Sequence, residues 1–152
     1  MRRLRVYADT SVYGGCFDAE FRVESRAFFR EVSAGRFVLL IAQITVRELA
    51  MAPDRVRSVL QELQPGTMEF LPFSDEVRLL RDAYMEFGVL GPASAGDAEH
   101  VAAAAVGEAD LLVSWNFKHI VHFDKIAAFQ AINVLRGYKP VRIHSPREVI
   151  EV

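Results

Sequence analysis

The sequence contains a single cysteine, Cys16, among 152 residues, which excludes an internal disulfide and a thiolate zinc cluster. It also lacks any apolar run close to the roughly 20 residues that cross a bilayer. The basic start, Met1 to Val6, leads straight into a strand-like segment, without the apolar stretch and cleavage site of a signal peptide. A cytoplasmic location is therefore expected.

Neither sign of charge is in large excess, and a net charge of −2 gives no indication of nucleic-acid binding by itself. The distribution is uneven, with eight acidic and two basic residues from Asp75 to Asp110, then six basic and one acidic from Leu111 to Arg147. Such asymmetry can place a cation-attracting edge beside a phosphate-attracting surface. Ordinary solvated helix faces would produce the same pattern.

Apolar patterns predict alternating strands and helices. The expected strands are 4–8, 37–42, 68–71, 111–114 and 141–143. The expected helices are 20–34, 45–51, 54–63, 74–87, 97–108 and 124–136, with Gly35 as a C-cap and Gly137 after the last helix. There is no internal repeat, low-complexity tract or linker. We therefore expect one domain over 1–152, a three-layer α/β/α sandwich with a mainly parallel sheet of four or five strands.

Polar residues lie near the ends of several of these βα units. Asp9 follows the first strand, Glu48 lies in a short helix, Asp97 is expected to open a helix, and Ser114 and Asn116 close the fourth strand. In open α/β sheets, ligands bind outside the carboxyl ends of the strands. Carboxylates gathered at that edge would hold a hard divalent cation through oxygen ligands.

Each of these residues also has a simpler explanation. Asp9 could cap the next helix through its own turn, and Asp97 could be an ordinary N-cap. Glu48 could be a solvated helical residue. His100, one turn after Asp97, is more often a packed histidine than a ligand, and Glu99 is expected to face solvent.

Asp110 and Asn116 lie at opposite ends of the fourth strand. Asp110 precedes that strand, roughly 13 Å from its carboxyl end at about 3.3 Å per residue, so we assign it to a turn outside the site. Asn116 follows the strand at the correct end. Its side chain can supply a carbonyl oxygen or orient a metal-bound water, but it adds no charge.

Four segments together resemble a PIN domain, with the size and spacing of VapC-type toxins from toxin–antitoxin pairs. They are Val6-Tyr7-Ala8-Asp9-Thr10-Ser11, the mid-chain Glu48, Gly96-Asp97-Ala98-Glu99-His100-Val101-Ala102, and Ala109-Asp110-Leu111-Leu112-Val113-Ser114-Trp115-Asn116. The resemblance spans essentially the whole chain. It implies a Mg²⁺- or Mn²⁺-dependent endoribonuclease, often a homodimer, held inactive by a small antitoxin protein.

The resemblance also implies roles for particular residues. The acidic quartet of the family maps onto Asp9, Glu48, Asp97 and the position of Asn116, which is often Asp. The first three would bind a metal, with Asn116 assisting, and the missing charge puts a second metal in doubt. The residues expected to contact the RNA substrate are Thr10, Ser11, Arg47, Ser114, Lys118 and His119, with Lys125 as a further backbone contact.

Three aromatic residues, Tyr13, Trp115 and Phe117, could stack on unpaired bases, although at least two of them are expected to pack inside the protein. Two rival functions remain open. An aspartyl-nucleophile phosphatase would need a second Asp where Ser11 stands. A non-catalytic binding or assembly domain would keep the fold and lose activity, and Asn116 is the residue that favours it. A homodimer would pair through helices 20–34 and 54–87.

Overall fold

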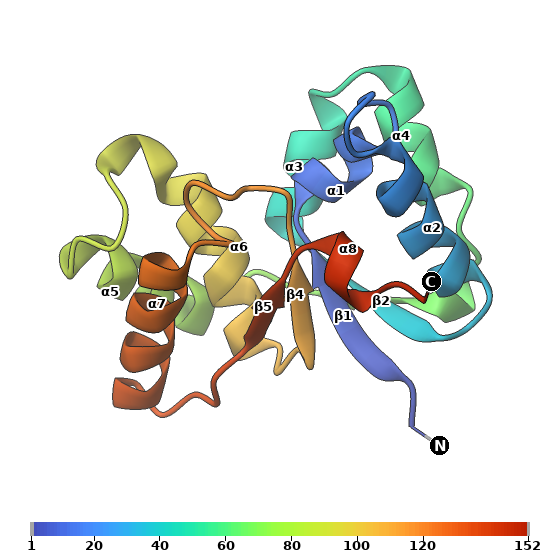
Figure 1. Ribbon diagram of the computed structural model, residues 1–152. Coiled ribbons are helices and arrows are strands. Elements are labelled where there is room, and N and C mark those ends of the chain that lie inside the picture. The colour runs from blue at the N-terminus through green and yellow to red at the C-terminus, as the bar shows by residue number, and fades with distance from the viewer. Residues whose placement is uncertain (1, 152) are drawn as a thin grey trace.

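The computed structural model describes residues 2–151 and contains one five-stranded, entirely parallel sheet with the order β3-β2-β1-β4-β5 (Figure 1). The strands are β1 (Leu4–Ala8), β2 (Phe37–Ala42), β3 (Met68–Leu71), β4 (Leu111–Val113) and β5 (Arg142–His144). The helices are α1 (Thr10–Gly15), α2 (Arg22–Ser33), α3 (Gln43–Ala50), α4 (Asp54–Gln61), α5 (Asp75–Glu86), α6 (Ala95–Val106), α7 (Phe123–Leu135) and α8 (Pro146–Val149), with 3₁₀ turns η1 (Pro65–Thr67) and η2 (Pro92–Ser94). The predicted fold class is confirmed.

Helices cover both faces of the sheet, because side chains of a strand alternate between its two faces. Tyr7, Leu40 and Leu112 pack against α5, α6 and α7 on one face. Their neighbours in sequence, such as Val6 and Leu39, pack against α1, α2 and α4 on the other (Figure 1). A sheet covered on both sides gives the unbroken apolar strands seen in the sequence. Within residues 2–151, no helix is both long and apolar enough to cross a membrane.

The register between β1 and β4 fixes the neighbours at the carboxyl edge of the sheet. Ala8 pairs with Val113, and the amide of Asp9 donates a hydrogen bond to the Val113 carbonyl at 3.2 Å. The amide of Ser114 donates to the His144 carbonyl of β5 at 3.1 Å. Asp9 and Ser114 therefore leave adjacent strands side by side.

Some predicted boundaries were wrong. The helix expected to open at Asp97 begins at Ala95, so Asp97 lies in its first turn, and Glu108 falls outside it with φ 55°. The last strand begins and ends one residue later than expected, and β4 ends at Val113. Gly35 was predicted correctly: it follows α2 with φ 84°, a backbone conformation that favours glycine at a helix end.

Two helices were not predicted. Helix α1 has six residues and ends in Gly14 and Gly15, which are poor helix formers, so local sequence does not indicate it. Helix α8 follows Ser145-Pro146-Arg147-Glu148, and the Glu148 carboxylate accepts a hydrogen bond from the Ser145 amide at 3.2 Å. That sequence is a capping box, so a usable signal for α8 was present.

The two glycines of α1 give a matched test of its packing. A Cβ on Gly15 would lie 2.8 Å from Trp115 Nε1 and closer still to Ser25 Oγ, whereas a Cβ on Gly14 would meet nothing within 4 Å. We expect Gly15→Ala to lower the free energy of unfolding by about 1–3 kcal/mol through overpacking. Gly14→Ala should leave it unchanged or raise it by up to about 1 kcal/mol. Urea unfolding of both variants measures the difference, and equal stabilities would contradict the described packing of α1.

Candidate functional site

Asp9 lies at the carboxyl edge of the sheet and points toward β4. It occupies the N-cap position of α1, yet its side chain makes no capping hydrogen bond, so the simple capping role is wrong. Its carboxylate instead accepts hydrogen bonds from Ser11 Oγ at 2.5 Å and Ser114 Oγ at 2.7 Å. The hydroxyl of Ser11 also accepts the amide of Trp115 at 2.9 Å. These bonds tie the end of β1 to the end of β4.

Glu48 approaches the same edge from α3. Its Oε1 accepts hydrogen bonds from Thr10 Oγ1 at 2.5 Å and from His100 Nε2 at 2.6 Å. A Cβ built on Gly96 would lie 3.8 Å from Glu48 Oε2, so the second carboxylate oxygen faces the start of α6. Glu48 is therefore bound to α1 and α6, and it is not a freely solvated helical residue.

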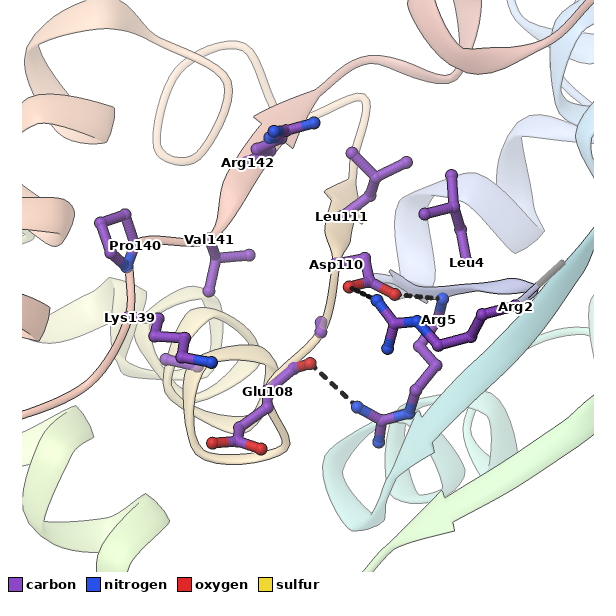
Figure 2. Close-up of a pocket in the computed structure, with 12 residues that line it drawn as sticks. Arg2, Leu4, Arg5, Glu108, Asp110, Leu111, Lys139, Pro140, Val141 and Arg142 are labelled. Carbon is purple, nitrogen blue, oxygen red and sulfur yellow. Dashed lines mark hydrogen bonds and ion pairs between the residues drawn. The ribbon is translucent and has the colours of Figure 1, made fainter.

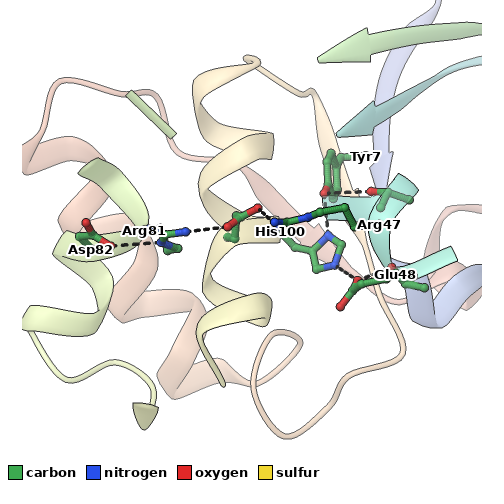
Figure 3. Close-up of polar contacts among 9 residues, drawn as sticks. Tyr7, Arg47, Glu48, Arg81, Asp82 and His100 are labelled. Atoms are coloured by element: carbon green, nitrogen blue, oxygen red, sulfur yellow. Dashed lines mark hydrogen bonds and ion pairs between the residues drawn. The ribbon is translucent and has the colours of Figure 1, made fainter. Parts of the chain in front are cut away.

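His100 lies among the predicted carboxylates. It is 2% exposed, and its Nδ1 shares a 2.6 Å hydrogen bond with the Tyr7 hydroxyl, opposite the Nε2 bond to Glu48 (Figure 3). Burial by itself lowers the pKa of His100, but the hydrogen bond that His100 donates to Glu48 and the negative charges of all three candidate carboxylates outweigh burial and raise that pKa. Of the three candidate carboxylates, Glu48 is the one hydrogen-bonded to this imidazole.

The loop after β4 folds back onto the start of α6. His119 Nδ1 lies 2.9 Å from Asp97 Oδ2, and the backbone amide of His119 donates to Asn116 Oδ1 at 2.9 Å. The amide of Asn116 donates to Ser114 Oγ at 2.9 Å. The Asn116 side chain thus stabilises the turn, and the same turn brings His119 to Asp97.

Asp9, which is buried, and Glu48, which is partly exposed, have pKa values shifted in opposite directions. Burial raises the pKa of Asp9, and the hydroxyl donors together with His100 only partly offset it. Burial also acts to raise the pKa of Glu48, but the hydrogen bond and positive charge of His100 outweigh it and lower the pKa. A bound cation would favour the ionised form of Asp9, because an opposite charge nearby lowers a carboxyl pKa.

The donor chemistry of the site fits a hard divalent cation, since such a cation prefers oxygen ligands and Asp9, Glu48 and Asp97 are all carboxylates. Within the described part of the chain, no lysine or arginine forms an ion pair with Asp9, Glu48 or Asp97. Glu48 and Asp97 contact His100 and His119 instead, and Asp9 contacts two serine hydroxyls. However, no three His, Cys, Asp or Glu side chains among residues 2–151 are grouped closely enough to hold a metal as they stand. To bind one, the carboxylates would have to exchange some hydrogen bonds for metal contacts.

Glu99 does not face solvent, and that expectation was wrong. It is 4% exposed, and its carboxylate accepts hydrogen bonds from Arg47 at 3.1 Å and Arg81 at 2.8 Å (Figure 3). Helix α6 is apolar nearly all round, which indicates a helix buried on every side. The apolar composition of α6 therefore indicated in the sequence that a charged residue such as Glu99 would be buried and would need partners.

The aromatic side chains near the site mostly pack inside the protein. Trp115 is buried, stacks on Phe21 with ring centroids 4.2 Å apart, and donates from Nε1 to Ser25 Oγ at 2.8 Å. Tyr13 is fully buried, so neither of these two can stack on bases. Phe117 is 46% exposed, and Lys118 beside it is exposed. Lys125 donates to the Val89 carbonyl at 2.8 Å.

Asp110 lies at the amino edge of the sheet, away from the candidate site. Its carboxylate accepts hydrogen bonds from the Arg5 amide at 2.8 Å and from Arg2 at 2.9 Å. It lines a pocket with Lys139 and Arg142, shown in Figure 2. The structure thus places Asp110 in the turn before β4, where the sequence indicated it.

Comparison with known proteins supports the fold. No protein-family model matches the chain, and no curated protein is similar to it in sequence. A similar structure occurs in one chain of the crystal structure of VapBC2 from Rickettsia felis. In that crystal structure VapBC2 is bound to a DNA fragment from its own promoter. The TM-score is 0.58 at 14% identity, over 93% of this chain and 98% of that chain. At this identity the likeness concerns the fold, a five-stranded parallel sheet with helices on both sides.

Proposed function

We propose that this protein is a PIN-like endoribonuclease that depends on Mg²⁺ or Mn²⁺. The observation that carries the proposal is the meeting of three chain segments at the carboxyl edge: Thr10, next to Asp9, bonds to Glu48, and Glu48 Oε2 faces Gly96, next to Asp97. Within residues 2–151, none of the three carboxylates has a lysine or arginine ion pair. Like charges gathered in a partly buried place repel one another, and a divalent cation would relieve that repulsion. The similar fold of a chain in VapBC2 supports the same reading.

Asp9, Glu48 and Asp97 are the residues that would hold the metal. Such a metal lowers the pKa of a bound water and stabilises charge on a phosphate. Thr10 and Ser11 orient the site through their hydroxyl bonds to Glu48 and Asp9. Ser114 holds the other oxygen of Asp9.

The RNA strand would be bound by groups around this centre. Arg47 has a side chain 62% exposed and precedes Glu48 directly, so it can contact a phosphate. Lys118 and Phe117, both exposed after β4, can contact the backbone and stack on an unpaired base. His119, bonded to Asp97, lies between these residues and α6. The choice of RNA over DNA rests on the resemblance to VapC-type toxins.

We propose that a small antitoxin protein is the partner of this nuclease. The support is that a chain of similar fold occurs in VapBC2, a structure bound to a DNA fragment from the promoter of that pair. A homodimer through α2 and the α4–α5 region is proposed as well. Exposed apolar side chains on two of these helices, Val23 of α2 and Leu79 of α5, support it.

A second candidate function is a catalytically inactive binding or assembly domain with the same fold. The observation that favours it is the use of Asn116 Oδ1 for the backbone amide of His119, together with the absence from residues 2–151 of a ready group of three metal ligands. Metal binding separates the two candidates.

Asp9→Asn should abolish metal-stimulated cleavage of a single-stranded RNA, because it removes the charge of a proposed ligand and keeps its size. Asp110→Asn is the matched control, since Asp110 pairs with Arg2 at the other edge of the sheet. This variant should leave the cleavage rate unchanged. Cleavage is measured on labelled RNA with Mn²⁺ and with EDTA. An unchanged rate for Asp9→Asn would remove Asp9 from the mechanism.

Mn²⁺ should also stabilise the folded protein without any RNA. At ten times its Kd, a ligand that binds only the folded state adds about 1.4 kcal/mol to the free energy of unfolding. For a chain of this size that is a rise in Tm of roughly 3–6 °C. Thermal unfolding in a Mn²⁺ titration measures it, with Asp9→Asn as the comparison. The absence of any shift at millimolar Mn²⁺ would favour the inactive binding domain.

A further inference from the structure

Two neighbouring residues of α6 hold two neighbouring residues of α3. Glu99 accepts a hydrogen bond from Arg47, and His100 donates one to Glu48 (Figure 3). Arg47 and Glu48 are the two α3 residues proposed above to face substrate and metal. Glu99 and His100 lie behind them and are buried, so they have no direct access to either ligand.

His100 uses both of its ring nitrogens, and this fixes the ring. One nitrogen contacts the Tyr7 hydroxyl at 2.6 Å, and the other donates to Glu48 at 2.6 Å. The Tyr7 hydroxyl also lies 3.4 Å from Thr45 Oγ1, so the chain of contacts ends in the core. As a result Glu48 Oε1 is anchored, and Oε2 is left facing the start of α6 beside Gly96.

Glu99 anchors the side chain of Arg47 in a similar way. One terminal nitrogen of Arg47 is bonded to Glu99, while the side chain remains 62% exposed. A guanidinium has five N–H donors, so most of them stay free for an anion. Arg81 supplies the second positive charge on Glu99. Arg81 is also paired with Asp82, so it is less available than Arg47 to bind an anion.

Fold stability alone gives little reason for these contacts. A buried ion pair is weak evidence for stability, because apolar residues of similar volume often serve as well or better. Helix α6 is otherwise rich in buried alanine and valine, which already pack against α5 and the sheet. The polar pair occurs where α6 meets α3, beside the candidate carboxylates.

We propose that Glu99 and His100 are positioning residues: His100 fixes Glu48 for the metal, and Glu99 fixes Arg47 for a phosphate of the substrate. This inference rests on the proposed nuclease function. It gives the two residues separable effects. His100 acts on metal affinity, while Glu99 acts on substrate binding and leaves metal affinity unchanged.

The role of His100 is tested by Mn²⁺ binding, followed by electron paramagnetic resonance in the absence of RNA. His100→Gln should weaken Mn²⁺ binding roughly tenfold, the usual effect of losing a group that orients a metal ligand. In a Glu48→Gln background the same change should have no further effect, because His100 acts through Glu48. Tyr7→Phe keeps the imidazole and removes one hydroxyl, so it should weaken binding in the same direction by a smaller factor. Circular dichroism checks that each variant is folded.

The role of Glu99 is tested by steady-state cleavage of a single-stranded RNA. Glu99→Gln should raise KM and leave kcat unchanged, and it should have no further effect in an Arg47→Ala background. Glu69→Gln is the matched control, because it breaks the Arg5–Glu69 pair on the sheet and should change none of these constants.

The outcomes are distinct. If Glu48→Gln weakens Mn²⁺ binding but His100→Gln and Tyr7→Phe do not, the role of His100 is overturned and the nuclease proposal stands. The role of Glu99 is overturned if Glu99→Gln lowers kcat and Mn²⁺ affinity together. It is also overturned if Glu99→Gln raises KM by the same factor in the Arg47→Ala background as in the wild type. A wild-type protein that neither binds Mn²⁺ nor cleaves RNA would overturn the positioning roles and the proposed function together.

Discussion

Because the five strands run in one direction, their carboxyl ends all lie along one edge of the sheet, and the candidate site depends on that edge. Asp9 and Ser114 are 105 residues apart in sequence and become hydrogen-bonded through the pairing of Ala8 with Val113. A slip of one residue in this register would turn alternate side chains to the opposite face and separate the pair. Helices α3 and α6 then bring Glu48 and Asp97 to the same edge.

The acidic residues at the two edges of the sheet and in α6 differ in their partners. Glu99, which is buried, is balanced by two arginines, and Asp110 is paired with Arg2. Asp9 instead receives hydroxyl hydrogen bonds, and Glu48 receives one from a hydroxyl and one from His100. Glu99 and Asp110 are therefore neutralised by arginine, while Asp9 and Glu48 have no lysine or arginine ion pair among residues 2–151.

Local sequence was enough for features that depend on local chemistry. The apolar run of β1 and the polar residues after it predicted where Asp9 would lie, and the length of β4 excluded Asp110 from the site. Features that depend on distant contacts were missed or placed inaccurately. Glu99 is buried because Arg47, 52 residues away, reaches it, and α1 forms because the body of the protein packs against it. The start of α6 was misplaced because the signal of its N-cap residue, Ser94, was overlooked in favour of Asp97.

We infer that three carboxylates meet at the carboxyl edge of the sheet. The most direct test of this arrangement is to soak a crystal of the protein in Mn²⁺ and to record anomalous diffraction above the X-ray absorption edge of manganese. Manganese is the useful probe because it binds carboxylate oxygens and scatters anomalously. The account predicts one strong anomalous peak bounded by Asp9, Glu48 and Asp97, with the Glu48 side chain still bonded to His100. A map with no peak there, or with manganese only at the Asp110 edge of the sheet, would contradict it.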